Sequence, residues 1–171
     1  MKKLSNTAVL VLAAFACLSG LFPSRAGAQA VKQRSEIDAK YKWDLSSIFP
    51  DDEAWRKSLE QVKGGLGGFD QYKGKLALSA ANVREALKLS DSLSVVAGNL
   101  SVYAGLKLDE DNRASKYQEM QSQASDLYSK LSKASSFIQP ELLAMDSATL
   151  MGYAASDPEL KAYTFMLTDL V

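Results

Sequence analysis

Apolar side chains recur at helical spacing between Ala114 and Ile138, and this periodicity constrains the fold more than any other feature of the sequence. Polar residues fall on the opposite side of such a helix, so the stretch predicts one amphipathic helix, roughly 38 Å long at 1.5 Å per residue. A helix of that length with one dry face must pack against other helices. The apolar stripe is Tyr117, Met120, Ala124, Leu127, Tyr128, Leu131, Ala134 and Ile138.

A second long helical segment is predicted after Ser79, a residue type that suits the amino-terminal cap position. Its apolar stripe runs from Val83 to Tyr103. The period shifts near Ser90–Ser92, which leaves open either one helix or two helices that meet there. Gly98 costs about 1 kcal/mol relative to alanine in a helix interior, a cost that is tolerable where another helix packs closely.

Shorter helices are predicted on both sides of this pair. Asp51 suits a cap for a helix with Trp55 in its stripe, and glycines at 64–68 are expected to end that helix as a flexible connector. Strand-type alternation is sustained nowhere. The sequence therefore predicts an all-α fold, an antiparallel helical array built on two long amphipathic helices. The further predicted helix starts are Pro140, Ser147 and Asp157.

Residues 1–30 have the features of a secretory signal peptide. Two lysines precede an apolar run, and Ala28 and Ala30 mark a cleavage site before Val31. A membrane anchor is the alternative, but the apolar run is shorter than the ~20 residues that a span requires. We therefore expect an exported chain, periplasmic or extracellular, with residues 31–40 as a flexible leader and no permanent membrane anchor.

The residue types needed for most catalytic chemistry are missing. The sequence contains no histidine, and its single cysteine, Cys17, lies in the predicted signal peptide, so an imidazole base and the usual zinc ligands are absent. The net charge is zero, which gives no field to attract nucleic acid. Asp109–Asn112 resembles the start of a calcium loop, but Ala114 and Met120 stand where an EF-hand needs Gly and Glu, so we expect these acids to cap the long helix. We predict no catalytic, metal-binding or cofactor-binding residue.

Short motifs are distributed along residues 41–171. The first motif, at residues 41–50, reads Tyr-Lys-Trp-Asp-Leu-Ser-Ser-Ile-Phe-Pro and has no helical period. It precedes an acidic cap and Trp55. We expect it to be an extended segment that holds its large apolar side chains, Trp43 and Phe49 among them, against the domain. The further motifs are Tyr-Lys-Gly-Lys-Leu (72–76), Val-Tyr-Ala (102–104), Phe-Ile-Gln-Pro-Glu-Leu-Leu (137–143) and Asp-Pro-Glu-Leu (157–160).

This ordered set resembles the amino-terminal helical region of oligoendopeptidase F, a family of thimet-oligopeptidase-like zinc peptidases. The resemblance covers residues 41–171 and implies an all-helical protein much longer than this chain. A signal peptide is a departure, since many relatives stay in the cytosol. The motif residues with expected structural roles are Trp43, Asp44, Leu45, Trp55, Tyr103 and Pro140.

The resemblance also implies where the chemistry of the whole protein lies. In that family a zinc ion, held by His-Glu-x-x-His and a downstream glutamate, activates water, and the motif glutamate takes the proton. None of those residues stands in this sequence. The chain is therefore expected to be a non-catalytic wall over the substrate cleft. Its partners would be the missing carboxyl-terminal catalytic region, with its Zn²⁺, and oligopeptide substrates through that region.

The apolar pattern of the last predicted helix still continues at Val171, which we interpret as a truncated domain. Two other interpretations stay open. The first is a complete secreted helical binding module without enzymatic activity, with its partner in a groove between helices. A stand-alone enzyme would require turnover from residues 31–171 by themselves, which we do not expect.

Overall fold

The computed structural model describes residue 32 and residues 36–170. The predicted signal peptide and its cleavage-site residues Ala28, Ala30 and Val31 lie outside the described residues, so that assignment stays a prediction. No helix in the described ranges combines the length and the apolar character needed to cross a bilayer.

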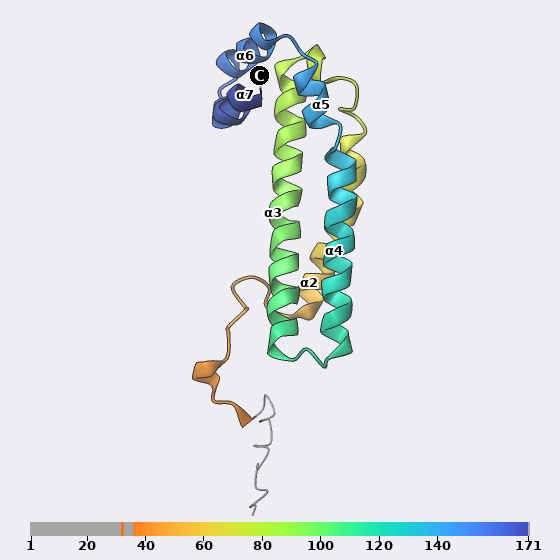
Figure 1. Ribbon diagram of the computed structural model, residues 1–171, viewed down its shortest axis with the longest axis vertical. Coiled ribbons are helices and arrows are strands. Elements are labelled where there is room, and N and C mark those ends of the chain that lie inside the picture. The colour runs from red at the N-terminus through yellow and green to blue at the C-terminus, as the bar shows by residue number, and fades with distance from the viewer. Residues whose placement is uncertain (1–31, 33–35, 171) are drawn as a thin grey trace, which may run out of the picture. The chain divides into compact units, whose positions relative to one another are not determined.

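Two long antiparallel helices dominate the unit formed by residues 38–171. α3 (Ala80–Glu110) and α4 (Ser115–Ser135) lie side by side and are joined by a short turn, and α2 (Asp52–Gly65) packs against both (Figure 1). The described residues form helices, turns and loops but no strand, which confirms the all-α prediction. The other elements are η2 (Ala39–Tyr41), η3 (Leu66–Phe69), η4 (Leu76–Leu78), α5 (Ile138–Leu143), α6 (Ser147–Ser156), η5 (Leu160–Tyr163) and α7 (Thr164–Leu170).

The main apolar core lies where α2, α3 and α4 meet. Trp55 of α2, Leu100 of α3 and Leu127 of α4 are all fully buried there. The predicted α4 stripe is confirmed except for Tyr128, which is 55% exposed. Because helices of this length are marginal in water alone, most of their stability comes from this packing. The fully buried α4 residues are Met120, Ala124, Leu127 and Leu131.

α3 is one continuous helix through Ser90–Ser92, so the alternative of two meeting helices is wrong. Early in the helix, Leu87 borders α5. Later, the Leu100 carbonyl and the Tyr103 hydroxyl bond to residues of α2. The buried face therefore rotates along α3 because its packing partners change, and this rotation produces the shift of period in the sequence.

α4 ends at Ser135, three residues before the predicted end. The hydroxyls of Ser135 and Ser136 donate to the carbonyls of Leu131 and Lys133 at 3.0 and 2.8 Å, bonds that compete with helix propagation. Pro140 has no amide hydrogen for the carbonyl of residue 136, and its ring crowds that carbonyl. The chain therefore turns and resumes as α5, with Pro140 in the first turn as predicted.

The segment that precedes α2 packs only in part. Leu45 and Phe49 are buried, and the Phe49 ring meets the Tyr103 ring edge-on with centroids 5.5 Å apart. Trp43 is 57% exposed, so the prediction that it is held against the domain is wrong. The Asp44 carboxylate accepts a hydrogen bond from the amide two residues later at 3.0 Å. This local turn replaces the extended segment that the sequence predicted.

The predicted caps at Asp51 and Ser79 are confirmed. The Asp51 carboxylate accepts a hydrogen bond from the Ala54 amide of α2 at 2.8 Å. The Ser79 hydroxyl accepts one from the Asn82 amide of α3 at 3.2 Å. α6 begins at Ser147 as predicted, with Asp146 as its cap. Each cap satisfies an amide that would otherwise lack a partner at the helix start.

Two predictions about helix ends need correction. Ala114 precedes α4 without a side-chain cap, and Asp111 instead accepts from the Arg113 amide at 3.1 Å inside the turn, so the acids at 109–112 do not cap α4. The glycines at 64–68 do not form a flexible connector, because α2 continues directly into η3. A Cβ on Gly65 would lie 3.0 Å from the Leu93 side chain, so a glycine permits this close approach.

Trp55 and Tyr103 fasten α2 to the long helices through polar atoms as well as apolar surface. The Trp55 indole nitrogen donates to the Leu100 carbonyl at 2.8 Å, and the Tyr103 hydroxyl donates to Asp52 at 2.8 Å. Lys116 of α4 forms an ion pair with the same Asp52 carboxylate. These contacts fix the positions of α2, α3 and α4 relative to one another, since buried polar atoms must keep their partners.

Trp55→Phe is expected to lower the free energy of unfolding by about 2–4 kcal/mol, because it removes a buried hydrogen bond and leaves a cavity. The matched control is Trp43→Phe, at the exposed tryptophan, which should change the same free energy by less than about 0.5 kcal/mol. Urea unfolding followed by circular dichroism measures both. Equal effects at the two tryptophans would contradict this assignment of their environments.

The Tyr103–Asp52 pair predicts a pH dependence. Burial alone raises the pKa of Asp52, but Lys116 and Tyr103 outweigh it and hold the pKa below its usual 3.8, whereas burial and Asp52 raise the pKa of Tyr103 above 10. The Asp52 contribution to stability is therefore present above pH 3.8 and lost as the pH falls below it. The Tyr103 contribution is present below pH 10 and lost above it.

Tyr103→Phe is expected to lower the unfolding free energy at pH 7 by about 1–2 kcal/mol and to make its fall above pH 10 shallower. Urea titrations at pH 7 to 11 measure this change. Tyr128→Phe, on the exposed side of α4, is the control and should leave the profile unchanged. An unaltered alkaline profile in Tyr103→Phe would show that the buried hydrogen bond is not responsible.

Candidate functional site

Residues from different motifs of the sequence meet in the structure. The Glu141 carboxylate of α5 accepts hydrogen bonds from the amides of Gly74 and Leu76 at 2.6 and 3.4 Å, so the motif at 137–143 is tied to the motif at 72–76. Gly74 has a φ of +75°, which favours glycine. The motif residues here hold elements together across a long sequence separation.

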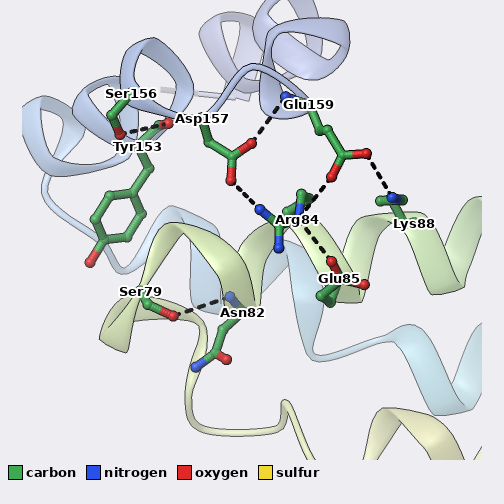
Figure 2. Close-up of polar contacts among 9 residues, drawn as sticks. All are labelled: Ser79, Asn82, Arg84, Glu85, Lys88, Tyr153, Ser156, Asp157 and Glu159. Carbon is green, nitrogen blue, oxygen red and sulfur yellow. Dashed lines mark hydrogen bonds and ion pairs between the residues drawn. The ribbon is translucent and has the colours of Figure 1, made fainter.

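Four charged residues, named here the Arg84 clasp, connect α3 to the segment between α6 and η5 (Figure 2). Arg84 contacts Asp157 at 2.5 Å and Glu159 at 3.2 Å, and Lys88 contacts Glu159 at 2.9 Å. Glu85 also accepts from Arg84 at 2.8 Å. Asp157 is the one buried charged residue within the described part of the chain, and this network supplies its partners.

The charges of the clasp are stabilised by one another. Burial alone raises the pKa of Asp157, but the Glu159 amide and the Arg84 guanidinium hold it below its usual range. Hydrogen bonds to Glu85 and Asp157 raise the pKa of Arg84, and Glu159 raises the pKa of Lys88. Arg84, Lys88 and Asp157 are therefore ionised at neutral pH, which suits a fastening between helices and not general acid–base catalysis.

Two tyrosines extend the attachment of the carboxyl-terminal helices. The Tyr163 hydroxyl of η5 donates to Asp91 of α3 at 2.6 Å, and the Tyr153 hydroxyl of α6 donates to the Ala77 carbonyl at 3.0 Å. Burial and the hydrogen bond to Asp91 raise the pKa of Tyr163 to about 12. The phenol therefore stays protonated and keeps this bond across the physiological pH range.

An apolar groove opens between α3, α5 and α7. It has a volume of about 500 Å³, and Gln139 and Asp169 are its polar residues. Phe165 of α7 is 85% exposed beside it, which is unusual for so large an apolar side chain. A groove of this size and polarity suits a few apolar side chains of another polypeptide better than a charged ligand. The apolar lining residues are Leu87, Ile138, Leu142, Phe165, Met166 and Leu170.

The predicted motif residues are not gathered at one site. Trp55 and Tyr103 lie in the core between α2 and α3, whereas Leu45 is buried ahead of α2. Trp43 is largely exposed, and Pro140 lies exposed in α5. These residues are therefore spread over the unit and do not form one site.

Sequence reasoning missed the groove and most of the Arg84 clasp. Glu159 belongs to a recognised motif, but its partners Arg84 and Lys88 lie more than 70 residues away and carry no local signal. Glu141 was likewise part of a motif, with its partner amides 65 and 67 residues earlier. The helical spacing of apolar residues in α7 indicates a helix but gives no sign that Phe165 stays exposed.

No group of three or more histidine, cysteine or acidic residues within the described part of the chain is placed to hold a metal ion. Because the sequence contains no histidine and its single cysteine is Cys17, the donor set does not fit a zinc site of the His-Glu-x-x-His type.

Known proteins resemble this chain in sequence and fold. Oligopeptidase PepF of Bacillus subtilis (strain 168) is 35% identical over 143 residues, which are 84% of this chain and 21% of that protein. The chromosomal oligoendopeptidase F of Lactococcus lactis subsp. cremoris is 37% identical over 142 residues, 82% of this chain and 24% of that protein. The crystal structure of oligoendopeptidase F from Enterococcus faecium matches with a TM-score of 0.65 and 26% identity, over 70% of this chain and 23% of that chain. No family model matches the sequence.

The chain spans less than a quarter of the length of these relatives. The matched part is helical, lacks the histidines of a zinc centre, and ties its motif at 137–143 to its motif at 72–76. The chain is therefore homologous to the amino-terminal part, about 22%, of the peptidases of the oligoendopeptidase F family.

Proposed function

We propose that this chain is the amino-terminal, non-catalytic helical part of an exported zinc metalloendopeptidase that hydrolyses oligopeptides, and that it forms a wall over the substrate cleft. The observation that carries the proposal is the match of 84% of this chain to 21% of an oligopeptidase, in a sequence without histidine. The zinc and the catalytic residues then belong to the remaining four-fifths of such a protein.

The physical character of the helices supports a role as scaffold. α2, α3 and α4 share one core, hydrogen bonds from Trp55 and Tyr103 join α2 to α3, and the Lys116–Asp52 ion pair joins α4 to α2. A rigid helical wall can limit a cleft to short, unfolded peptides because it does not yield to a folded protein. Its outer side suits water, since α4 carries exposed charges at Lys116, Glu119, Asp126, Lys130 and Lys133.

Export is supported by the sequence of residues 1–30. The proposed location, periplasmic or extracellular, follows from removal of that segment by a signal peptidase. The remaining chain has no cysteine, so it needs no disulfide in an oxidising compartment.

The groove favours a second candidate function, a secreted helical module that binds a partner without catalysis. Six apolar residues line it, and Phe165 stands exposed at its edge. A self-sufficient module should be monomeric and unfold cooperatively, whereas a part of a larger protein should aggregate or melt broadly through this exposed surface. Light scattering and calorimetry of the purified chain distinguish the two.

A chimera tests the proposed function directly. The 171-residue chain replaces the matching amino-terminal part of the Bacillus subtilis oligopeptidase PepF, and hydrolysis of an internally quenched oligopeptide is measured. We expect kcat/KM within about tenfold of the parent enzyme, a change of at most about 1.4 kcal/mol in transition-state stabilisation. The control is the same oligopeptidase with its amino-terminal part deleted, which should be far less active. A chimera no better than the deletion variant would refute the proposal.

The isolated chain should neither hydrolyse the quenched peptide nor retain zinc after dialysis, because it lacks the imidazole ligands that hold zinc in such sites. Elemental analysis by mass spectrometry and a fluorescence assay measure the two properties. Stoichiometric zinc, or turnover without added protein, would overturn the assignment of this chain as non-catalytic.

A further inference from the structure

α3 lacks charged residues in its middle part. Between Ser92 and Leu106 the sequence contains no Asp, Glu, Lys or Arg, a length of roughly four helical turns. Helix faces in contact with water normally carry charged residues, and helices without them are normally buried on all sides. α4, with exposed charges along its outer side, shows the usual pattern for comparison.

One side of this uncharged stretch is nevertheless open to solvent. Val95 is 64% and Val102 is 51% exposed, and Gly98 lies between them. The three residues are spaced by three and four positions, so they share one face of the helix. The core lies on the opposite side, where Ala97, Leu100 and Ala104 are buried. The residues Val95, Gly98 and Val102 are named here the outer stripe.

The outer stripe continues a face of α3 that bonds, in its first part, to the carboxyl-terminal segments. Arg84, Lys88 and Asp91 precede Val95 at the same spacing of three and four residues. These three side chains bond to Asp157, Glu159 and Tyr163. In Figure 1, α6 and α7 accordingly lie beside the beginning of α3. The first part of this face thus has bonding partners in the carboxyl-terminal segments, whereas Val95 and Val102 of the outer stripe stay exposed.

We propose that the outer stripe is the docking site of an amphipathic helix supplied by the part of the peptidase that lies beyond the matched region. The inference rests on the proposed function, because the occupant belongs to the four-fifths of the relatives that this chain does not span. A helix fits best, because the described secondary structure is helical and the first part of the same face bonds to the segment that joins α6 to η5. The surface is uncharged, with Asn99 exposed beside the two valines, so it requires a partner stripe that is apolar or neutral, not a charged one.

Gly98 gives this surface its shape. A Cβ at position 98 would meet nothing within 4 Å, so no neighbour inside this chain explains the glycine. Flanked by two valines, it leaves a shallow notch that lets another helix approach closely. A glycine in a helix interior costs stability, and a docked helix provides the compensation that this chain by itself does not.

Cysteine labelling tests whether the outer stripe is covered in the assembled protein. Val95→Cys is placed in the 171-residue chain and in the PepF chimera, with other cysteines replaced by serine, and the rate of maleimide labelling is measured. We expect rapid labelling in the chain alone and labelling about tenfold slower or more in the chimera. The matched control is Tyr128→Cys, which should label at similar rates in both proteins because it lies on the charged side of α4.

Gly98→Arg supplies a second, independent test. In the chain alone it should keep or raise the melting temperature, because the added side chain meets no neighbour and glycine is the poorer helix former. In the chimera it should lower the melting temperature, because it places a charge in the docking surface. Gly152→Arg in α6, where a Cβ also meets nothing within 4 Å, is the control and should have little effect in either protein.

The outcomes separate the two proposals. An active chimera in which Val95→Cys labels as fast as in the chain alone, or in which Gly98→Arg behaves like Gly152→Arg, would overturn the docking site and leave the proposed function standing. An inactive parent chimera would overturn the proposed function, and the docking site with it. Protection of Val95→Cys in the chain alone, together with a dimeric mass by light scattering, would identify a second copy as the occupant and overturn the assignment to the peptidase.

Discussion

Burial of apolar stripes between α3 and α4 is the interaction on which the other elements depend. The two helices lie antiparallel, and Leu100 and Leu127 are fully buried in their shared core. Neither helix would be stable alone in water, because propensity contributes little compared with packing. α2 is attached to α3 by two hydrogen bonds, from the Trp55 indole to the Leu100 carbonyl and from the Tyr103 hydroxyl to the Asp52 carboxylate.

The structure uses two kinds of fastening, and they differ in strength. Near α2, the hydrogen bond from Trp55 is buried and the one from Tyr103 is partly buried, so breaking either leaves a polar group that water solvates poorly. At the other end of α3, the Arg84 clasp is partly exposed, and only Asp157 within it is buried. Exposed ion pairs contribute little and weaken with salt. The ion pairs of the clasp are therefore the more sensitive of the two to salt, whereas Leu150, Leu160 and Leu167 anchor α6, η5 and α7 in the apolar core.

A homologue of one part of a peptidase need not contain chemistry to serve it. Catalysis by a zinc centre requires ligands that this chain lacks, but access to such a centre depends on the walls around it. The two long helices differ in a way that suits the proposed role of a wall. α4 presents charge to solvent, whereas α3 presents an exposed, uncharged face around Gly98. Because of this difference, the α4 side of the unit suits contact with water and the α3 side suits contact with protein.

The sequence by itself determined the all-α class, the caps at Asp51 and Ser79, and the buried α4 stripe, because these follow from periodicity and bonds between near neighbours. Only the tertiary structure decided which apolar residues stay exposed, among them Trp43 and Phe165. It also decided the partners of Glu141 and Glu159, since those bonds join residues about 70 positions apart and leave no local pattern. Local rules describe a helix, whereas the neighbours that cover it depend on how the whole chain packs.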